Sequence, residues 1–310
     1  MSHHCSPLNL PSVGIILTTY NGAEFLEDQL DSLLAQEDVD VHIFAFDDKS
    51  SDRTIEILEA YSDRHEGTFS IVENDPNSGG TGINIFRNLA KVSPNHDYFA
   101  LADQDDIWLP NKLSRAVEKL SEESADLYFS NLLAWDGKTE VLGTVTKNAP
   151  MEAYDHLFGG GSAGCTYVLN KHFFQHVRDV VARTDIAGVP RISHDWIIYF
   201  LARHYGFEVS ASPDALIKYR IHTDSQYGGM SLGGVGAIRR KFRMLRAGFL
   251  SEQINNALLF AREGSRDREI LLAYRKGLIS RISVLCRFHF ALTRGKSRFF
   301  ALIITSLFLY

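Results

Sequence analysis

Residues 41–54 read VHIFAFDDKSSDRT, and this segment indicates the fold of the chain more clearly than any other. The apolar run 41–46 predicts a buried strand, which ends in two aspartates. Apolar residues then recur at helical spacing over 51–61. A strand, a polar turn and a helix in this order are the unit from which parallel sheets are built.

Units of the same kind lie on both sides of this segment. Residues 13–17 form an apolar run that is broken by the polar turn TTYNG, and a helical pattern follows to residue 34. Further strands are predicted at 69–72, 98–102, 127–135 and 165–169, with helices at 83–92, 113–120, 171–182 and 193–202. α/β proteins bind ligands at the carboxyl ends of parallel strands, so we expect the polar strand ends to face one crevice.

The composition is that of an ordinary globular protein: of 310 residues, 45% are hydrophobic and 23% are charged. This composition excludes disorder for most of the chain. Cys5, Cys165 and Cys286 are odd in number and scattered, which excludes a disulfide framework and a zinc site built from paired cysteines. The first residues lack the basic and apolar segments of a secretory signal, so we expect a cytoplasmic protein.

Charge is distributed unevenly along the chain, whose net charge is −6. From Ile238 onward there are 15 of the 32 basic residues but only four of the 38 acidic residues. Residues 1–237 therefore contain 17 basic and 34 acidic residues. A basic tail on an acidic body is typical of proteins that meet a polyanion, either nucleic acid or an anionic membrane.

The loop after the strand at 98–102 reads DQDD and places Asp103, Asp105 and Asp106 side by side. A hard divalent cation relieves the repulsion among such carboxylates most simply, and it can bridge a diphosphate. A solvated acidic turn before the helix at 113–120 explains the motif equally well, because aspartate is common at turns and caps.

Asp47 and Asp48 end the strand at 41–46. Ser51 or Asp52 is expected to cap the helix that follows. Asp48 is expected to have a different role, because a carboxylate at a strand end can accept a hydrogen bond from an N–H group of a nucleobase.

Three motifs together resemble glycosyltransferase family 2: IILTTYN at 15–21, FDDKSSDRT at 46–54 and DQDDIWLPNKL at 103–113. The third motif most resembles the bacterial rhamnosyltransferase-like members, because it has glutamine among the acidic residues and tryptophan before proline. The motifs stand in the family's order over about the first 120 residues, which makes the combination specific although each motif alone is weak. Beyond Tyr128, only Asp195 and the region of Arg220 can be matched.

This resemblance implies a GT-A fold and suggests roles for residues of this chain. Thr18, Tyr20 and Asp48 would surround the base of a nucleotide-diphosphate sugar, and Asp103 would lie near its ribose. Asp105 would hold Mg²⁺ or Mn²⁺.

Further roles follow from the same resemblance. Arg87 and Asn88 would contact the donor from their helix. Arg220 would close over the diphosphate, with His222 as a metal ligand. A histidine after a strand is more often a surface or core residue, so both interpretations of His222 stay open. Lys49 departs from the family pattern, which usually has a small residue there, so we expect a different contact near the base.

Asp195, in the sequence SHDW at 193–196, matches the position of the family's catalytic carboxylate. Displacement at the anomeric carbon needs a base on the face opposite the leaving diphosphate, and burial beside Trp196 can make a carboxylate more basic. Capping of the following helix by Ser193 or Asp195 is the alternative interpretation.

Two later segments are also distinctive. The run GGGSAG at 159–164 lacks the ending of a P-loop and the spacing of a Rossmann fingerprint, so we expect a close-packed loop of the acceptor site. Residues 239–250 have the pattern of a basic amphipathic helix, which suits a membrane interface. The apolar end at 299–310 is shorter than the about 20 residues that span a bilayer. Packing of the tail against the body explains the pattern nearly as well.

The sequence therefore predicts a GT-A catalytic domain at 1–228 and a basic helical extension at 229–310 on the inner face of the cell membrane. The expected reaction is inverting transfer of a sugar, with rhamnose as one candidate, from a dTDP- or UDP-sugar. The expected acceptor is a saccharide or lipid-linked oligosaccharide in the synthesis of a bacterial surface polysaccharide such as O-antigen. We expect no nucleic-acid partner. A metal-dependent nucleotidyltransferase and a non-enzymatic adaptor with a basic tail stay open as alternatives.

Overall fold

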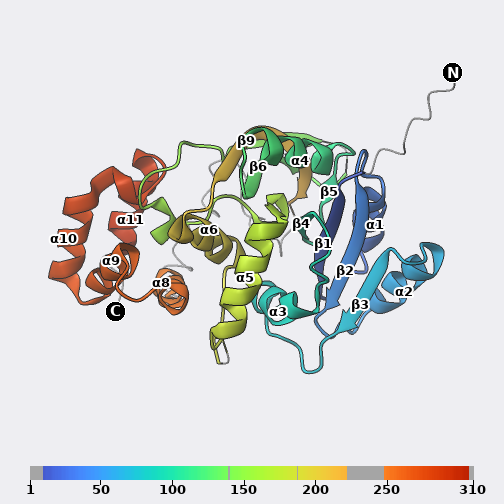
Figure 1. Cartoon of the computed structure of the whole chain (residues 1–310), viewed down its shortest axis with the longest axis horizontal. Helices are drawn as coiled ribbons and strands as arrows, with labels where there is room; N and C mark the ends of the chain where they lie inside the picture. The colour runs from blue at the N-terminus through green and yellow to red at the C-terminus, as the bar shows by residue number, and fades with distance from the viewer. Residues whose placement is uncertain (1–9, 139, 187, 222–247, 307–310) are drawn as a thin grey trace, which may run out of the picture.

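The computed structural model describes residues 10–138, 140–186, 188–221 and 248–306. Its centre is a nine-stranded sheet in the order β3-β2-β1-β4-β8-β6-β9-β5, with β7 paired to β6 (Figure 1). The strands are β1 (Ser12–Thr19), β2 (Asp40–Asp47), β3 (Phe69–Glu73), β4 (Tyr98–Ala102), β5 (Ile107–Trp108), β6 (Leu127–Trp135), β7 (Val141–Val145), β8 (Val168–Asn170) and β9 (Val209–Arg220). The α-helices are α1 (Leu26–Leu34), α2 (Thr54–Arg64), α3 (Thr81–Asn88), α4 (Lys112–Glu122), α5 (Lys171–Arg183), α6 (His194–Tyr205), α8 (Phe249–Phe260), α9 (Arg266–Arg275), α10 (Leu278–Phe288) and α11 (Lys296–Ser306).

The first half of the sheet is parallel. β1 pairs in parallel with β2 and with β4, and β2 pairs in parallel with β3. The carboxyl ends of β1, β2 and β4 therefore lie at one edge, as their sequences predict. The second half is mixed, because β8 runs antiparallel to both β4 and β6 whereas β9 runs parallel to β6.

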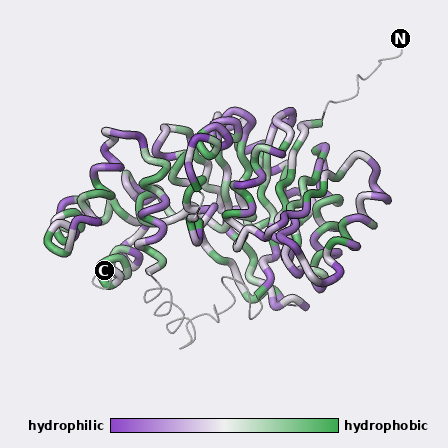
Figure 2. Tube along the Cα trace, turned by 90° about the horizontal axis from the view of Figure 1, so that it is seen from below, coloured by the Kyte–Doolittle hydropathy of each residue, from purple (hydrophilic) through white to green (hydrophobic). Residues whose placement is uncertain are grey.

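Helices cover both faces of the sheet. Successive strand residues point to opposite faces, so Ile15 belongs to one hydrophobic cluster and Ile16 to another. Helices α1, α2 and α4 supply residues to the first cluster, and α3, α5 and α6 supply residues to the second. Figure 2 shows how hydrophobic and hydrophilic stretches alternate along the folded chain.

The structure differs from the sequence prediction in short elements. In place of the strand predicted at 165–169, the structure has a 3₁₀ turn (Gly164–Thr166) followed by β8. The helix predicted at 83–92 is shorter, because α3 is followed by a separate 3₁₀ turn (Leu89–Lys91). β5 and β7 were not predicted, because a two-residue strand such as β5 becomes visible only through its pairing with β9. The helix predicted at 51–61 begins at Thr54, whose N–H donates to Asp52 Oδ1 at 3.1 Å.

The C-terminal helices pack against the rest of the chain. Buried residues of α8, α9 and the 3₁₀ turn His289–Leu292, among them Ile254, Leu271 and Leu292, share one hydrophobic cluster with Phe200 of α6. In Figure 1, α8–α11 lie at the end of the molecule opposite β2 and β3. The predicted boundary at residue 228 and most of the predicted basic helix at 239–250 lie outside the described residues.

A buried polar cluster joins α9 to the body. Asp267 Oδ2 accepts hydrogen bonds from His156 Nε2 at 3.0 Å and from His204 Nδ1 at 2.7 Å. His204 Nε2 in turn accepts the N–H of Arg262 at 2.9 Å. Burial opposes ionisation of Asp267, but the hydrogen bonds from the two histidines outweigh it and hold the pKa of Asp267 well below its usual range.

Asp267→Asn is expected to lower the free energy of unfolding by about 2–3 kcal/mol at neutral pH, because it removes a charged partner of two buried imidazoles. The folded-state pKa of Asp267 is depressed, so its contribution is present above the unfolded pKa of about 4 and is lost as the pH falls below it. Urea titrations at several pH values measure this. The exposed Glu269→Gln on the same helix is the control, and an equal effect of both substitutions would contradict the assignment.

Candidate active site

The ends of β1 and β2 are tied together by side chains of the DDKSSD segment. Asp47 accepts hydrogen bonds from Thr19 Oγ1 at 2.8 Å and from the Ser50 N–H at 2.7 Å. Asn21 has a positive φ of 47°, which asparagine tolerates, and its Oδ1 accepts the Ser51 N–H at 2.8 Å. Much of this motif therefore builds the edge of the crevice.

Asp48 is buried at the end of β2 and accepts three hydrogen bonds from the loop after β3. Ser78 donates its N–H to Oδ1 at 2.6 Å and its hydroxyl to Oδ2 at 2.8 Å. Asn74 Nδ2 donates to Oδ1 at 3.2 Å. These contacts fix both carboxylate oxygens of Asp48 and hold the loop over the end of β2.

The two residues predicted to contact the donor from α3 lie in different surroundings. Asn88 is buried, and its Nδ2 donates to Asn74 Oδ1 at 3.1 Å and to Asn84 Oδ1 at 2.8 Å. Arg87 is exposed. Asn88 therefore supports the loop that contacts Asp48. His222 lies outside the described residues.

Gln104 joins the turn after β1 to the loop after β4. The Tyr20 N–H donates to Gln104 Oε1 at 2.7 Å, and Gln104 Nε2 donates to the Tyr20 carbonyl at 3.1 Å. Gly22 allows this approach, since a Cβ there would come within 2.4 Å of Gln104 Oε1. Thr18 is buried, whereas the Tyr20 residue is 52% exposed. The role of Gln104 was not predicted from the sequence.

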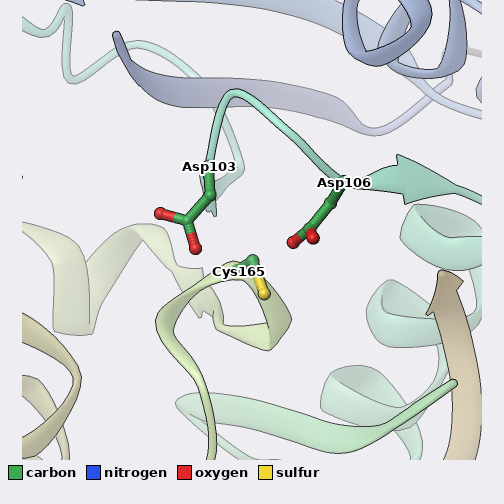
Figure 3. A group of neighbouring side chains, drawn as sticks. All are labelled: Asp103, Asp106 and Cys165. Atoms are coloured by element: carbon green, nitrogen blue, oxygen red, sulfur yellow. The ribbon is translucent and has the colours of Figure 1, made fainter. Parts of the chain in front are cut away.

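The loop after β4 brings two carboxylates close to a thiol. The ligand atoms of Asp103, Asp106 and Cys165 all lie within 4.8 Å of one another, and Figure 3 shows the three side chains around one space. Asp106 is 1% exposed, and its Oδ1 accepts the Arg220 N–H at 3.2 Å. Its Oδ2 has no hydrogen-bond partner among the described residues. The half-buried Asp105 is outside this group.

The electrostatics of this loop favour a cation. Burial raises the pKa of Asp103, and the charges of Asp105 and Asp195 add to the effect, so that it reaches about 7. Burial also raises the pKa of the Cys165 thiol, which stays protonated and is then a poor metal ligand. The carboxylate oxygens are hard donors, and together with the unpartnered Asp106 Oδ2 they fit Mg²⁺ or Mn²⁺.

Arg220 holds the acidic loop from the end of β9. Its Nε donates to the Asp105 carbonyl at 2.9 Å, and its Nη2 donates to Asp28 Oδ2 at 3.0 Å. Its guanidinium carbon lies 4.5 Å from the Phe25 ring centroid and 4.4 Å from that of Trp135. The predicted contact of Arg220 with a diphosphate would require exchange of one of these hydrogen-bond partners.

Asp195 lies in the first turn of α6. Its Oδ1 accepts hydrogen bonds from the Ser193 hydroxyl and from the Trp196 N–H, the latter at 2.8 Å. Its Oδ2 has no hydrogen-bond partner among the residues that the structure describes. Asp195 thus takes part in the helix start with one oxygen only. Its charge also helps to raise the pKa of Asp103, so the two carboxylates lie near each other.

The glycine-rich loop packs against the start of α6. A Cβ on Gly160 would meet the Trp196 Cα at 3.3 Å, and a Cβ on Gly164 would come within 2.1 Å of His194 Nε2. From the C-terminal region, the buried Arg294 donates to the carbonyl of Gly160 at 2.6 Å. The close packing of this loop agrees with the sequence, whereas the link to Arg294 could not be predicted, because it depends on the fold of the tail.

Comparison with known proteins agrees with this geometry. Residues 14–174 match the model of the family described as "Glycosyl transferase family 2". The chain is 33% identical over 217 residues to "dTDP-rhamnosyl transferase RfbG" of Shigella flexneri, covering 68% of this chain and 73% of the relative. It is 32% identical to "Putative teichuronic acid biosynthesis glycosyltransferase TuaG" of Bacillus subtilis, covering 69% of this chain and 81% of the relative.

Two solved structures share the fold at low identity. The S. aureus TarS 1–349 complex with UDP-GlcNAc matches with a TM-score of 0.57 at 17% identity, over 94% of this chain and 83% of that chain. The mannosyltransferase PcManGT from Pyrobaculum calidifontis, in complex with GDP-Man and Mn²⁺, matches with a TM-score of 0.57 at 17% identity, over 97% of this chain and 81% of that chain. The predicted GT-A fold is confirmed, and the chain belongs to glycosyl transferase family 2.

Proposed function

We propose that this protein transfers a sugar from a nucleotide-diphosphate donor to an acceptor hydroxyl with inversion at the anomeric carbon. The observation that carries the proposal is that Asp195 lies close enough to the acidic loop for its charge to raise the pKa of Asp103. A base and a site for the leaving diphosphate would then lie near each other. Membership of the family favours sugar transfer over the nucleotidyltransferase and the adaptor.

The acidic loop would bind the diphosphate through a divalent cation. The carboxylates of Asp103 and Asp106 offer oxygen ligands in the group described above. Asp105 stands between them in the sequence, and we assign it to the metal on the family resemblance alone. Mg²⁺ or Mn²⁺ bound here supplies positive charge to the departing diphosphate. Arg220 contributes by fixing the backbone of Asp105.

Asp195 would act as the base. Its Oδ1 is held by the Trp196 N–H at 2.8 Å and by the Ser193 hydroxyl, so the orientation of the carboxylate is fixed. Its Oδ2 can then take the proton of the acceptor hydroxyl as the new glycosidic bond forms. Attack from the Asp195 side, opposite the leaving diphosphate, inverts the anomeric centre.

The donor is proposed to be a dTDP- or UDP-sugar. The Shigella flexneri relative is named a dTDP-rhamnosyl transferase, and the TarS structure contains UDP-GlcNAc. Thr18, Tyr20 and Asp48 lie at the ends of adjacent strands, where the base would bind. Thymine and uracil have an N3–H group that can donate a hydrogen bond to the Asp48 carboxylate, whereas N3 of cytosine is itself an acceptor.

Wild-type protein with Mn²⁺ is therefore expected to bind dTDP and UDP about tenfold or more tightly than CDP, because cytosine leaves the Asp48 carboxylate facing another acceptor. Asp48→Asn should reduce this difference to about twofold, because an amide can also donate. Isothermal titration with the three nucleotides measures the effect, with Glu59→Gln on the exposed side of α2 as the control. Equal affinity of the wild type for all three would refute this base-binding role.

The acceptor is proposed to be a saccharide or lipid-linked saccharide of a bacterial surface polysaccharide, and the enzyme is proposed to work at the inner face of the membrane. The curated relative TuaG is named for teichuronic acid biosynthesis. Among the described helices, none combines the length and the apolar character needed to cross a bilayer. Large apolar side chains are nevertheless exposed from α10 to α11, namely Leu278, Ile279, Ile282, Phe290, Phe300 and Ile304. Residues 270–310 contain no acidic residue, so the charged side chains that α10 and α11 themselves contribute are all basic.

Ile279→Ser is expected to weaken binding to vesicles of anionic phospholipid about tenfold, because burying an isoleucine contributes about 1.5–3 kcal/mol. Ile279 is 87% exposed, so its replacement should not disturb the fold. Vesicle sedimentation measures binding, and Val141→Ser, at a 47% exposed position on β7, is the matched control. Equal binding of Ile279→Ser and wild type would contradict docking through α10.

A further inference from the structure

The glycine loop at 159–164 is anchored by the hydroxyl group of Tyr167, a fully buried residue. This hydroxyl accepts hydrogen bonds from the N–H groups of Gly161 at 3.0 Å and Ser162 at 3.2 Å. A Cβ on Gly161 would come within 2.9 Å of the Tyr167 oxygen, so this close approach needs a glycine. The loop is therefore shaped around one buried hydroxyl.

The same hydroxyl contacts the proposed base. Tyr167 donates a hydrogen bond to the backbone carbonyl of Asp195 at 3.0 Å. Burial raises the pKa of Tyr167, so its hydroxyl keeps the proton that it donates. The side chain of Asp195 is held separately, by the Ser193 hydroxyl and the Trp196 N–H. Tyr167 thus fixes the backbone of Asp195 and does not occupy its Oδ2.

A buried arginine of the C-terminal region holds the other side of the glycine loop. Arg294 lies in the segment before α11 and is 5% exposed. Its Nη2 donates to the carbonyl of Gly160 at 2.6 Å and also to the carbonyl of Gly161. Its Nη1 donates to the carbonyl of Lys147 at 3.1 Å. Three carbonyls from two segments thus converge on one planar guanidinium, a geometry that the single ammonium group of a lysine does not reproduce.

Arg294 also reaches α6 through a carboxylate. Its Nε lies 3.3 Å from Asp155 Oδ2, which accepts the hydroxyl of Tyr199 on α6 at 2.9 Å. Asp155 is buried like Arg294, so each charge offsets part of the cost of burying the other. The guanidinium carbon of Arg294 lies 5.4 Å from the centroid of the Tyr199 ring. Arg294 is therefore joined to α6 in two ways, through the glycine loop and through Asp155.

We propose that Arg294 is a positioning residue of the reaction, which orients Asp195 through the glycine loop and Tyr167. The proposal rests on the proposed function and adds a residue of the C-terminal region to the support of the base. Three successive hydrogen bonds make this link, from Arg294 to the loop, from the loop to Tyr167 and from Tyr167 to Asp195. A shift of about 1 Å in a reacting group can cost about a hundredfold in rate. The C-terminal region thus completes the geometry of the base in addition to covering the core.

Two arginines of the C-terminal region hold the two ends of α6, which lies next to the C-terminal helices in Figure 1. Arg294 acts at the start of α6. Arg262 acts near its end, where its Nη2 donates to the carbonyl of His204 at 3.0 Å. Only the contacts of Arg294 lead to Asp195. Arg262 is therefore the matched control, because it is the same residue type in the same region and contacts the same helix.

The first test measures the link without the reaction. Hydrogen exchange of the full chain, followed by mass spectrometry, compares peptides that cover the start and the end of α6. Tyr167→Phe removes one hydroxyl, and Arg294→Lys keeps the charge but loses the planar fork. Both should speed exchange at the start of α6 about tenfold or more, whereas Arg262→Lys should speed it only at the end. Unchanged exchange at the start in both variants, or an equal change there in Arg262→Lys, would overturn the proposal.

The second test measures turnover of the full chain. Tyr167→Phe and Arg294→Lys should each lower kcat about tenfold to a hundredfold and keep the Kd of the donor within about twofold, because a displaced base costs rate and not donor affinity. Release of dTDP from dTDP-rhamnose in the presence of Mn²⁺ measures kcat, and thermal shift measures donor binding. Arg262→Lys should keep the kcat of the wild type. A loss of donor affinity as large as the loss of kcat would mean general damage to the site and would contradict a positioning role.

Double variants show whether the effect passes through Asp195. In an Asp195→Asn background, Tyr167→Phe and Arg294→Lys should lower kcat by less than about twofold, because the base that they orient is already absent. If each substitution lowered kcat in this background by the same factor as in the wild type, both residues would act independently of Asp195. That result would overturn the proposal.

The two tests separate this proposal from the proposed function. If exchange at the start of α6 responds as stated but the wild type releases no nucleoside diphosphate from dTDP-rhamnose or UDP-GlcNAc, the structural link stands and the proposed function fails. If the wild type turns over and Asp195→Asn is slow, but Arg294→Lys and Tyr167→Phe keep the kcat of the wild type, the proposed function stands and the positioning role is wrong.

Discussion

Replacing Asp195 by asparagine is expected to lower kcat by about 10²- to 10⁴-fold, the range expected for loss of a general base. The Kd of the donor should stay nearly unchanged, because the role proposed for Asp195 is to act on the acceptor hydroxyl. Asparagine has the same size, and its Oδ1 can still accept the Trp196 N–H, so the start of α6 should be preserved. The amide cannot take a proton, and this is the one property that the substitution removes.

Steady-state release of nucleoside diphosphate measures kcat, and thermal shift with donor and Mn²⁺ measures binding. Asp63→Asn on the exposed surface of α2 is the matched control and should keep full activity. Ser193→Ala should cause a smaller loss, because it loosens the orientation of Asp195 without removing the carboxylate. Near-normal turnover of Asp195→Asn would mean that another group is the base.

Asp105→Asn is expected to lower turnover at least about a hundredfold, because it would weaken the proposed metal site that stabilises the charge of the leaving diphosphate. Chelation of metal from the wild type should cause the same loss, and added Mn²⁺ or Mg²⁺ should restore wild-type activity. The variant should need a higher Mn²⁺ concentration for the activity that remains. Turnover as a function of Mn²⁺ concentration measures both effects.

The choice between Asp105 and Asp106 as the metal ligand is also testable. Asp106 is buried and accepts the Arg220 N–H, so Asp106→Asn is expected to act on the position of β9 and on stability. Titration of Mn²⁺ binding by electron paramagnetic resonance compares the two variants, with Asp63→Asn as the control. Full activity of the wild type in excess chelator would refute the metal role. Normal Mn²⁺ binding by Asp105→Asn, with loss in Asp106→Asn, would move the ligand to Asp106.

The parallel half of the sheet could be predicted because its signal is local. Each of the segments 13–17, 41–46 and 98–102 combines an apolar run with a polar end, and each is a strand in the structure. The short strand β5 and the pairing of β9 with β6 depend on residues far apart in the sequence. Such contacts leave no periodic signal, so the order of strands in the second half could not be derived.

The candidate site was partly predictable for the same reason. Asp48, Asp103 and Asp105 follow strands directly, so the sequence places them at the edge of the sheet. The partners of these residues come from elsewhere: Ser78 approaches Asp48 from another loop, and Cys165 lies beside Asp103 through the fold of β8. The resemblance assigns the same role, contact with the donor, to Arg87 and Asn88. The structure separates these neighbours, because helix geometry exposes Arg87 and buries Asn88.

The C-terminal tail shows a further limit of sequence patterns. Its charge and apolar residues predict either membrane contact or packing, and the described helices have features of both. Arg294 and Asp267 are held in the body by specific polar contacts, while Ile279 is 87% exposed. Deleting residues 238–310 would therefore expose the core as well as remove the proposed membrane surface, so single substitutions are the cleaner test.

Anomeric configuration tests the proposed reaction most directly. Proton NMR of the first turnovers of a dTDP- or UDP-sugar with Mn²⁺, using the acceptor or, in its absence, water, reports whether the transferred sugar keeps the configuration of the donor. A single displacement with attack from the Asp195 side predicts a product of opposite anomeric configuration. In Asp195→Asn, the product signal should grow only at the reduced rate expected for that variant. A product that retains the configuration of the donor would contradict this mechanism.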